Sequence, residues 1–287
     1  MKFGIVYAYW SKDWEGDYID TIRRAAKCGF DVLEIFTPLL LTLPQSKLDE
    51  LKFVSTEENI ELAYLVGLGK QHDLSSDDAG IRKDGIGYIK QILNVIHYLG
   101  GTCFSGINYC AWSNFDGDID KPRRRANAIS SLKELAATAE EYNISYNLEV
   151  TNRFEQFLLN TSKEAVEFVN EVDSPNVNIL LDAFHMMIEE DSMKEAIKLA
   201  NDKLGHFHVG TNNRKPPAPG LMNWGQITDG LKAIKYDKIV TLEPLVRTGG
   251  TVATDSKVWR DMTGGADDDK MDQDAIASLN FMKSLLK

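Results

Sequence analysis

Short apolar runs alternate with longer segments of helical periodicity along this sequence, and this alternation limits the possible fold more than any other feature. Repeated strand–helix pairs are typical of a parallel sheet, because each helix returns the chain to the start of the next strand. The predicted strands are Phe3–Tyr9, Val32–Phe36, Leu62–Gly67, Cys103–Ile107, Ser145–Glu149, Val177–Leu181, Gly205–Val209 and Ile239–Leu242. The predicted helices are Tyr18–Cys28, Lys47–Glu58, Asp78–Leu99, Pro122–Tyr142, Lys163–Glu171, Met193–Leu199, Trp224–Ile234 and Gln273–Leu286.

Eight such pairs without a Ser/Gly-rich linker predict one (β/α)8 TIM barrel domain over residues 1–287. The alternative is a doubly wound open sheet. The GxGxxG turn that such a sheet often carries does not follow the first predicted strand, which favours the barrel.

The charge balance argues against a nucleic acid or an anionic membrane as partner. The 43 acidic and 32 basic residues give a formal net charge of -11, which repels phosphate groups. The run Arg123–Arg125 at a helix start therefore indicates a solvated face. The three cysteines form no CxxC pair, so neither a disulfide framework nor a cysteine zinc site is expected. Without a signal-peptide pattern or an apolar run of ~20 residues, we expect a cytoplasmic protein.

Charged side chains follow predicted strands at the ends where barrel enzymes carry their active sites. Four of them can bind a metal and fall on successive strands, namely Glu149, Asp182, His208 and Glu243. Any one of these alone is more often a salt-bridged or hydrogen-bonded group, but their shared placement favours a common site. Three carboxylates and one imidazole favour a hard or borderline ion, so Mn²⁺, Co²⁺ or Mg²⁺ is the predicted cofactor.

Three further polar residues follow the same strands and are expected to face a substrate. Glu155 lies six residues after Glu149, His185 three after Asp182, and Arg214 six after His208. Arg214 can hydrogen-bond sugar oxygens, and His185 can donate to a carbonyl oxygen as negative charge develops there. Alternatively, Arg214 is a solvated loop charge and His185 is a residue at a helix N-terminus.

Two glutamates beside a divalent ion suit proton movement next to a carbonyl group. An ion that grips the C2 carbonyl and the C3 hydroxyl of an α-hydroxy ketone stabilises the enediolate formed when the C3 proton leaves. Inversion at C3 then needs one base on each face of this planar intermediate. Glu149 and Glu243 are the predicted catalytic pair.

Motifs along the whole chain together resemble one family. They are Gly4–Ile5 with Tyr9–Trp10 and Trp14, Glu149–Val150 with Asn152–Glu155, Leu181–Asp182 with Phe184–Met186 and Ile188–Glu190, Gly205–His208, Glu243–Pro244, and Gly249–Thr251 with Val258–Asp261. In order and spacing they are similar to the ketose 3-epimerases, the D-tagatose and D-psicose (D-allulose) 3-epimerase family.

This resemblance implies a (β/α)8 barrel, Mn²⁺ or Co²⁺ bound by the four strand-end residues, and C3 proton exchange by Glu149 and Glu243. It also implies contacts from Glu155, His185 and Arg214 to O1 to O3 of a free ketohexose, and a homodimer or homotetramer. The other expected substrate-binding residues are Trp14 and Trp112 as a stacking wall, with Gly67, Gly106, Val6 and Leu245. Segment 104–112 looks more like the tagatose-type enzymes.

Four positions depart from the family pattern, namely Val6, Met187, Thr211 and Leu245. Val6 and Leu245 replace aromatic residues and leave extra room near the sugar tail, which puts the substrate range in doubt. Three alternatives remain open: an aldose–ketose isomerase of the same superfamily, a catalytically silent sugar-binding barrel, and a barrel DNA-repair nuclease. The acidic balance and the small number of histidines disfavour the nuclease.

Overall fold

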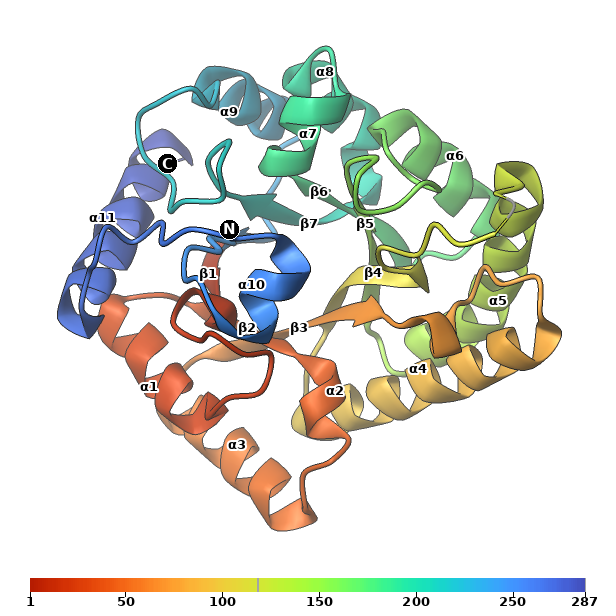
Figure 1. Cartoon of the computed structure of the whole chain (residues 1–287), viewed down its shortest axis with the longest axis horizontal. Helices are drawn as coiled ribbons and strands as arrows, with labels where there is room; N and C mark the ends of the chain where they lie inside the picture. The colour runs from red at the N-terminus through yellow and green to blue at the C-terminus, as the bar shows by residue number, and fades with distance from the viewer. Residues whose placement is uncertain (118, 287) are drawn as a thin grey trace.

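The chain forms a closed barrel of eight parallel strands in sequence order (Figure 1). The structure, a computed structural model, describes residues 1–117 and 119–286. The strands are β1 Lys2–Val6, β2 Val32–Phe36, β3 Glu61–Leu68, β4 Cys103–Ala111, β5 Ser145–Val150, β6 Val177–Asp182, β7 Leu204–Val209 and β8 Ile239–Leu242. The barrel closes where β1 pairs with β8, from Lys2 opposite Ile239 to Ile5 opposite Leu242. The predicted TIM barrel is confirmed, and the open sheet is excluded.

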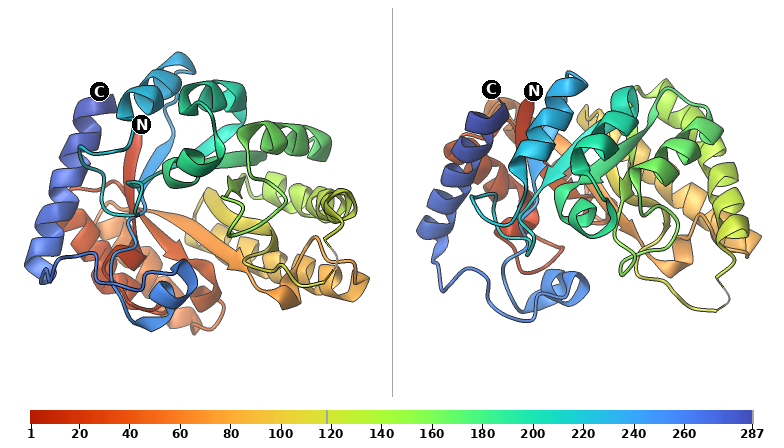
Figure 2. Two further views of the ribbon diagram at one scale, coloured as in Figure 1. Left: turned by 45° about the horizontal axis from the view of Figure 1, so that its top comes forward. Right: turned by 90° about the horizontal axis from the view of Figure 1, so that it is seen from above.

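Helices surround the barrel, and both termini lie together at one end of it, while α10 lies at the other end (Figure 2). The outer helices are α1 Tyr18–Cys28, α3 Gln45–Glu57, α4 Ala79–Leu99, α5 Lys121–Glu141, α6 Ser162–Val172, α8 Met193–Ala200, α9 Trp224–Ala233 and α11 Asp268–Leu286. Polar side chains fix where several of them begin. Thr161 and Glu164 form a capping box at α6, and Asp17 accepts hydrogen bonds from two backbone N–H groups of α1.

Three short helices after strands were not predicted from the sequence: α2 Thr37–Leu40, α7 Ala183–Glu189 and α10 Gly250–Ser256. Two of them begin at residues that favour a helix start, because Pro38 lies in the first turn of α2 and the side chain of Asp182 caps α7. The first strand is shorter than predicted, because Tyr7–Tyr9 forms a 3-10 turn. These segments carry the chain across the barrel end that contains the site.

Side chains inside the barrel change from apolar to polar along the strands. The apolar layer near the strand starts is Val32, Ala63, Cys103 and Ile239. Because inward positions recur every second residue, the next layer includes Ser105, His206 and Thr241. Nδ1 of His206 lies 2.8 Å from the Ser105 hydroxyl, and its Nε2 lies 2.7 Å from the Thr241 hydroxyl. Burial and the neighbouring His208 hold the pKa of His206 well below its usual value, so this imidazole is neutral.

The arginine run on α5 corrects one expectation. Arg123 and Arg125 lie at the surface and pair with Asp77 and Glu171. Arg124, in contrast, is buried and pairs with buried Asp73. The prediction of a solvated face is therefore wrong for Arg124.

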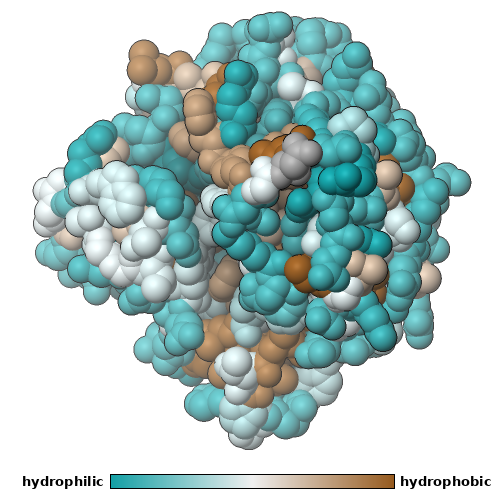
Figure 3. Space-filling view, turned by 45° about the vertical axis from the view of Figure 1, so that its right-hand side comes forward, coloured by the Kyte–Doolittle hydropathy of each residue, from teal (hydrophilic) through white to brown (hydrophobic). Residues whose placement is uncertain are grey.

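Hydrophilic residues cover most of the face in Figure 3, and hydrophobic residues gather in small patches. Among the described residues, the structure contains no helix with the length and apolar content needed to cross a membrane.

Candidate active site

The four predicted metal-binding side chains converge at the C-terminal ends of neighbouring strands. Glu149 lies near the end of β5, Asp182 ends β6, His208 lies near the end of β7, and Glu243 follows β8. In the register of the sheet, Asp182 is paired with His208. All four side chains are buried, and one potential ligand atom from each lies within 4.8 Å of the others. The predicted convergence of these four residues is therefore confirmed, and metal binding by them stays a prediction.

The geometry of this cluster fits a divalent cation. Oδ1 of Asp182 caps α7 through the Phe184 N–H, whereas its buried Oδ2 has no hydrogen-bond partner among the described residues. Both ring nitrogens of His208 are likewise buried without a hydrogen bond in the described chain. Three carboxylates this close together repel one another unless a cation neutralises them. Their oxygen-rich donor set suits Mn²⁺, Co²⁺ or Mg²⁺.

The two predicted catalytic glutamates have different electrostatic environments. Burial raises the pKa of Glu149 above its usual value. Burial also opposes ionisation of Glu243, but Arg214 and His208 outweigh it and hold the pKa of Glu243 below its usual value. Two carboxylates of similar depth thus differ because one has an arginine partner.

Arg214 connects the cation cluster with the rest of the pocket. Its Nη2 donates to Oε2 of Glu243 over 2.5 Å, and its Nη1 lies 3.6 Å from Oε1 of Glu155. The guanidinium carbon also lies 4.6 Å from the ring centroid of Phe184. The backbone φ of Arg214 is +57°, a left-handed conformation that is uncommon outside glycine and that often occurs at functional sites.

His185 and Glu155 complete the polar side of the pocket. Nε2 of His185, at the start of α7, lies 3.5 Å from Oε1 of Glu149. Both His185 and Glu155 contact Asn152, whose amide nitrogen lies 2.7 Å from Nδ1 of His185 and 3.1 Å from Oε1 of Glu155. Sequence reasoning did not assign Asn152. Its position three residues after Glu149, on the same strand-end loop, was the available signal.

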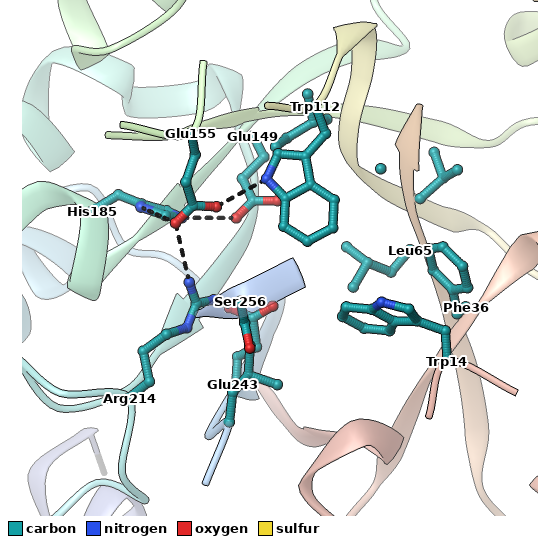
Figure 4. A pocket seen from close by; sticks show the side chains of 14 residues that line it. Trp14, Phe36, Leu65, Trp112, Glu149, Glu155, His185, Arg214, Glu243 and Ser256 are labelled. Carbon is teal, nitrogen blue, oxygen red and sulfur yellow. Dashed lines mark hydrogen bonds and ion pairs between the residues drawn. The ribbon is translucent and has the colours of Figure 1, made fainter. Parts of the chain in front are cut away.

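Aromatic and aliphatic side chains form the opposite side of the pocket, as Figure 4 shows. The Trp14 ring lies 5.1 Å from Phe36 and 6.1 Å from Trp112, measured between centroids. Trp112 Nε1 donates to Glu155 over 3.1 Å, and Trp14 Nε1 donates to Asp255 of α10 over 2.8 Å. The pocket has an empty volume of about 440 Å³, including its open mouth. Such a hollow, polar on one side and apolar on the other, suits a small sugar.

Of the remaining predicted binding residues, two line the pocket and two do not. Gly67 and Leu245 line the pocket, with Gly67 directly under the Trp112 ring. Val6 and Gly106 are not among the described residues that line it. Val6 is a buried core residue at the end of β1, and Gly106 has a φ of +110° with Val66 directly beside it. Their sugar contacts stay predictions.

Sequence reasoning missed five lining residues, namely Phe36, Leu65, Val66, Ile107 and Ser256. Phe36 and Leu65 are ordinary apolar residues of β2 and β3, so nothing in their local sequence distinguishes them from the core. Ser256 ends α10, and only the folded chain brings that helix to the pocket.

The chain is similar to known proteins along its whole length. The model of the xylose isomerase-like TIM barrel family matches residues 22–280. A D-psicose 3-epimerase of Ruminiclostridium cellulolyticum is 41% identical over 288 residues, which cover 100% of this chain and 98% of the relative. A D-psicose 3-epimerase of Agrobacterium fabrum is 38% identical, with 100% and 99% covered. A crystal structure of D-psicose 3-epimerase with D-tagatose from Clostridium cellulolyticum has a TM-score of 0.98 and 41% identity, with both chains fully covered.

The chain therefore belongs to the ketose 3-epimerases, carbohydrate isomerases of the xylose isomerase-like TIM barrel family.

Proposed function

We propose that this protein inverts C3 of free ketohexoses and interconverts pairs such as D-fructose with D-psicose and D-tagatose with D-sorbose. One observation carries the proposal. Two buried glutamates, Glu149 and Glu243, enter the same pocket from the ends of different strands, and both belong to the cluster that suits a cation. The relatives named D-psicose 3-epimerase support the same reaction.

Glu149, Asp182, His208 and Glu243 would hold a divalent cation, which would supply electrophilic stabilisation of the sugar oxygens next to the reacting carbon. The chain's own residues move the proton. Glu149 and Glu243 act from the two sides of C3, one removing the proton and the other returning one to the opposite face. Arg214, which is hydrogen-bonded to Glu243, keeps that carboxylate ionised and oriented.

The other pocket residues bind and orient the sugar. We propose that His185, Glu155 and Arg214 hydrogen-bond O1 to O3, and the support is that all three line the same pocket as the two glutamates. Trp14, Trp112 and Leu245 face the polar groups and contact the remaining carbons of the sugar. Their apolar surface also excludes water from the reacting end, which strengthens the electrostatic interactions there.

Incubation with D-fructose, D-tagatose and D-psicose in D₂O tests this function. With Mn²⁺ or Co²⁺ present, NMR should detect the C3 epimer with deuterium at C3. Deuterium at C1 or C2 would instead indicate an aldose–ketose isomerase. Sugar binding without turnover in the cation-loaded protein would indicate a silent sugar-binding barrel. Glu149→Gln and Glu243→Gln should each abolish epimerisation, because either leaves a working base on only one face of C3.

The same panel of sugars identifies the preferred ketose. The reported relatives are D-psicose 3-epimerases, so they do not support the resemblance of segment 104–112 to tagatose-type enzymes. Leu245 lines the pocket in place of an aromatic residue and leaves room for different sugar tails.

We also propose a homodimer or homotetramer in the cytoplasm. Large apolar side chains on late loops support self-association, since Leu221 is 79% and Trp259 is 71% exposed. Light scattering after size-exclusion chromatography measures the number of chains, and a monomer would contradict the proposal.

A further inference from the structure

Glu34 is a buried carboxylate inside the barrel to which neither the sequence nor the proposed reaction assigns a role. It lies in the middle of β2, between the inward positions Val32 and Phe36. Its exposed fraction is 0%. A carboxylate at such a depth is costly unless a specific partner compensates it.

Two histidines of β7 are the nearby partners. Oε2 of Glu34 lies 2.9 Å from Nε2 of His208, and Oε1 lies 3.7 Å from Nδ1 of His206. Neither oxygen makes a hydrogen bond in the described part of the chain, and neither does Nε2 of His208, so the 2.9 Å approach is an electrostatic contact between a buried carboxylate and a buried imidazole.

His206 does not compensate Glu34, because both of its ring nitrogens already have hydroxyl partners in Ser105 and Thr241. The same engagement argues against a second cation held by Glu34, His206 and His208, although their atoms lie close enough together. A neutral imidazole with both nitrogens occupied has no lone pair left for a metal. His208 is therefore the partner of Glu34.

His208 lies between Glu34 and the cation cluster. Its Nε2 faces Glu34, while its Nδ1 lies 3.5 Å from Oε2 of Glu243. A histidine that carries its proton on Nε2 presents that proton to the Glu34 carboxylate 2.9 Å away, so the contact favours this tautomer. That tautomer leaves the lone pair on Nδ1, and a histidine binds a metal through such a lone pair.

We propose that Glu34 is a positioning residue that holds the proton of His208 on Nε2 and directs the Nδ1 lone pair toward the cation. The inference rests on the cation site of the proposed function and adds a residue to it. Glu34 touches neither the sugar nor the cation and acts only through His208.

Cation affinity measured by calorimetry, without substrate, tests this role. We expect Glu34→Ala to bind Mn²⁺ about 10- to 100-fold more weakly than the parent protein. Glu34→Gln keeps the shape and one acceptor oxygen, so it should lie between the two. Asp73→Asn is the matched control, because it alters another buried carboxylate, which pairs with Arg124 away from the cluster. Its Mn²⁺ affinity should equal that of the parent even if its unfolding temperature falls.

The His208 tautomer provides a second readout that does not depend on turnover. Nitrogen NMR of histidine-labelled, Mg²⁺-loaded parent protein should place the His208 proton on Nε2, and Glu34→Gln should reduce that preference. Unchanged Mn²⁺ affinity in a folded Glu34→Ala, or a parent proton on Nδ1, would overturn the inference while leaving the proposed function intact. A parent protein that binds no cation would overturn both, so the two failures are distinguishable.

Discussion

The side-chain amide of Asn152 donates to Nδ1 of His185 over 2.7 Å. The orientation of this amide is fixed, because its oxygen accepts from the Phe154 N–H over 2.9 Å and its nitrogen also donates to Glu155. Nδ1 of His185 must therefore accept, which leaves the ring proton on Nε2. That N–H faces the pocket, with Oε1 of Glu149 3.5 Å away. One asparagine thus fixes His185 as a hydrogen-bond donor.

Asn152→Asp should lower kcat/KM at least tenfold. A carboxylate at this position accepts a hydrogen bond from Nδ1–H and removes the constraint that keeps the proton on Nε2. Steady-state kinetics with the preferred ketose measures the change. Asn94→Asp on α4 is the control, because that exposed side chain already acts as an acceptor, from Tyr142. Equal loss in both variants would exclude a specific role for Asn152.

Arg214→Lys should reduce kcat/KM about 10- to 100-fold although it keeps the positive charge. Lysine lacks the planar fork of arginine, so it cannot contact Glu243 and Glu155 at the same time. A hydrogen bond to a charged group contributes about 1.5–3 kcal/mol. Kinetics and thermal unfolding should be measured on the same samples. Arg247→Lys, which alters an arginine bonded to the Trp10 carbonyl, should retain activity.

Gly106→Ala should mainly lower the stability of the fold, and Gly67→Ala should mainly weaken sugar binding. An added Cβ at Gly106 meets the Val66 carbonyl oxygen at 2.2 Å, and the φ of +110° adds strain. We expect Gly106→Ala to lower the free energy of unfolding by more than about 2 kcal/mol. At Gly67, the new Cβ meets the Trp112 ring at 2.8 Å, so the variant should mainly raise KM. Denaturant unfolding and kinetics distinguish these effects, and the reverse pattern would contradict the assignment.

Cation removal should lower thermal stability as well as activity. Without a cation, Glu149, Asp182 and Glu243 repel one another in a buried space. Adding Mn²⁺ at 100 times its dissociation constant should stabilise the folded chain by about 2.7 kcal/mol. Thermal unfolding with chelator, with Mn²⁺, and with KCl at matched ionic strength measures the effect. Equal unfolding temperatures under all three conditions would argue against a cation site.

The cysteines should be unreactive in the folded protein. Burial raises the pKa of Cys103 to about 12 and that of Cys28 to about 11, and it raises the pKa of Cys110 well above its usual value. Since the thiolate is the reactive form, little of it exists at pH 8. A colorimetric thiol reagent should therefore detect almost no thiol in the native chain and all three after denaturation. Rapid labelling of the native chain would contradict this.

The sequence was sufficient for features that depend on local periodicity. Strand spacing predicted the barrel, and the strand-end positions of Glu149, Asp182, His208 and Glu243 predicted their convergence. These inferences succeed because parallel strands bring equivalent positions to one end of a barrel.

Features that depend on long-range partners were not predictable. Arg124 looks like any surface arginine until Asp73 packs against it, and Asn152 gains its role only through His185 on another strand-end segment. Glu34 offered one signal, because it is a charged residue in the middle of an apolar strand. Its partner, His208, lies 174 positions further along the chain, so the sequence does not show the pair. Helix α10 lacks a strong sequence pattern, and its contacts with Trp14 hold it at the pocket.

The strand that closes the barrel also delivers Glu243. Because β8 pairs with β1, the last strand to leave the ribosome must dock beside the first one, and Glu243 follows it immediately. A nascent chain that ends after Val209 already carries Glu149, Asp182 and His208, but it lacks the residue that completes the cluster. Barrel closure and completion of the cluster are therefore one event during biosynthesis, and a partly synthesised chain cannot carry out a two-base reaction.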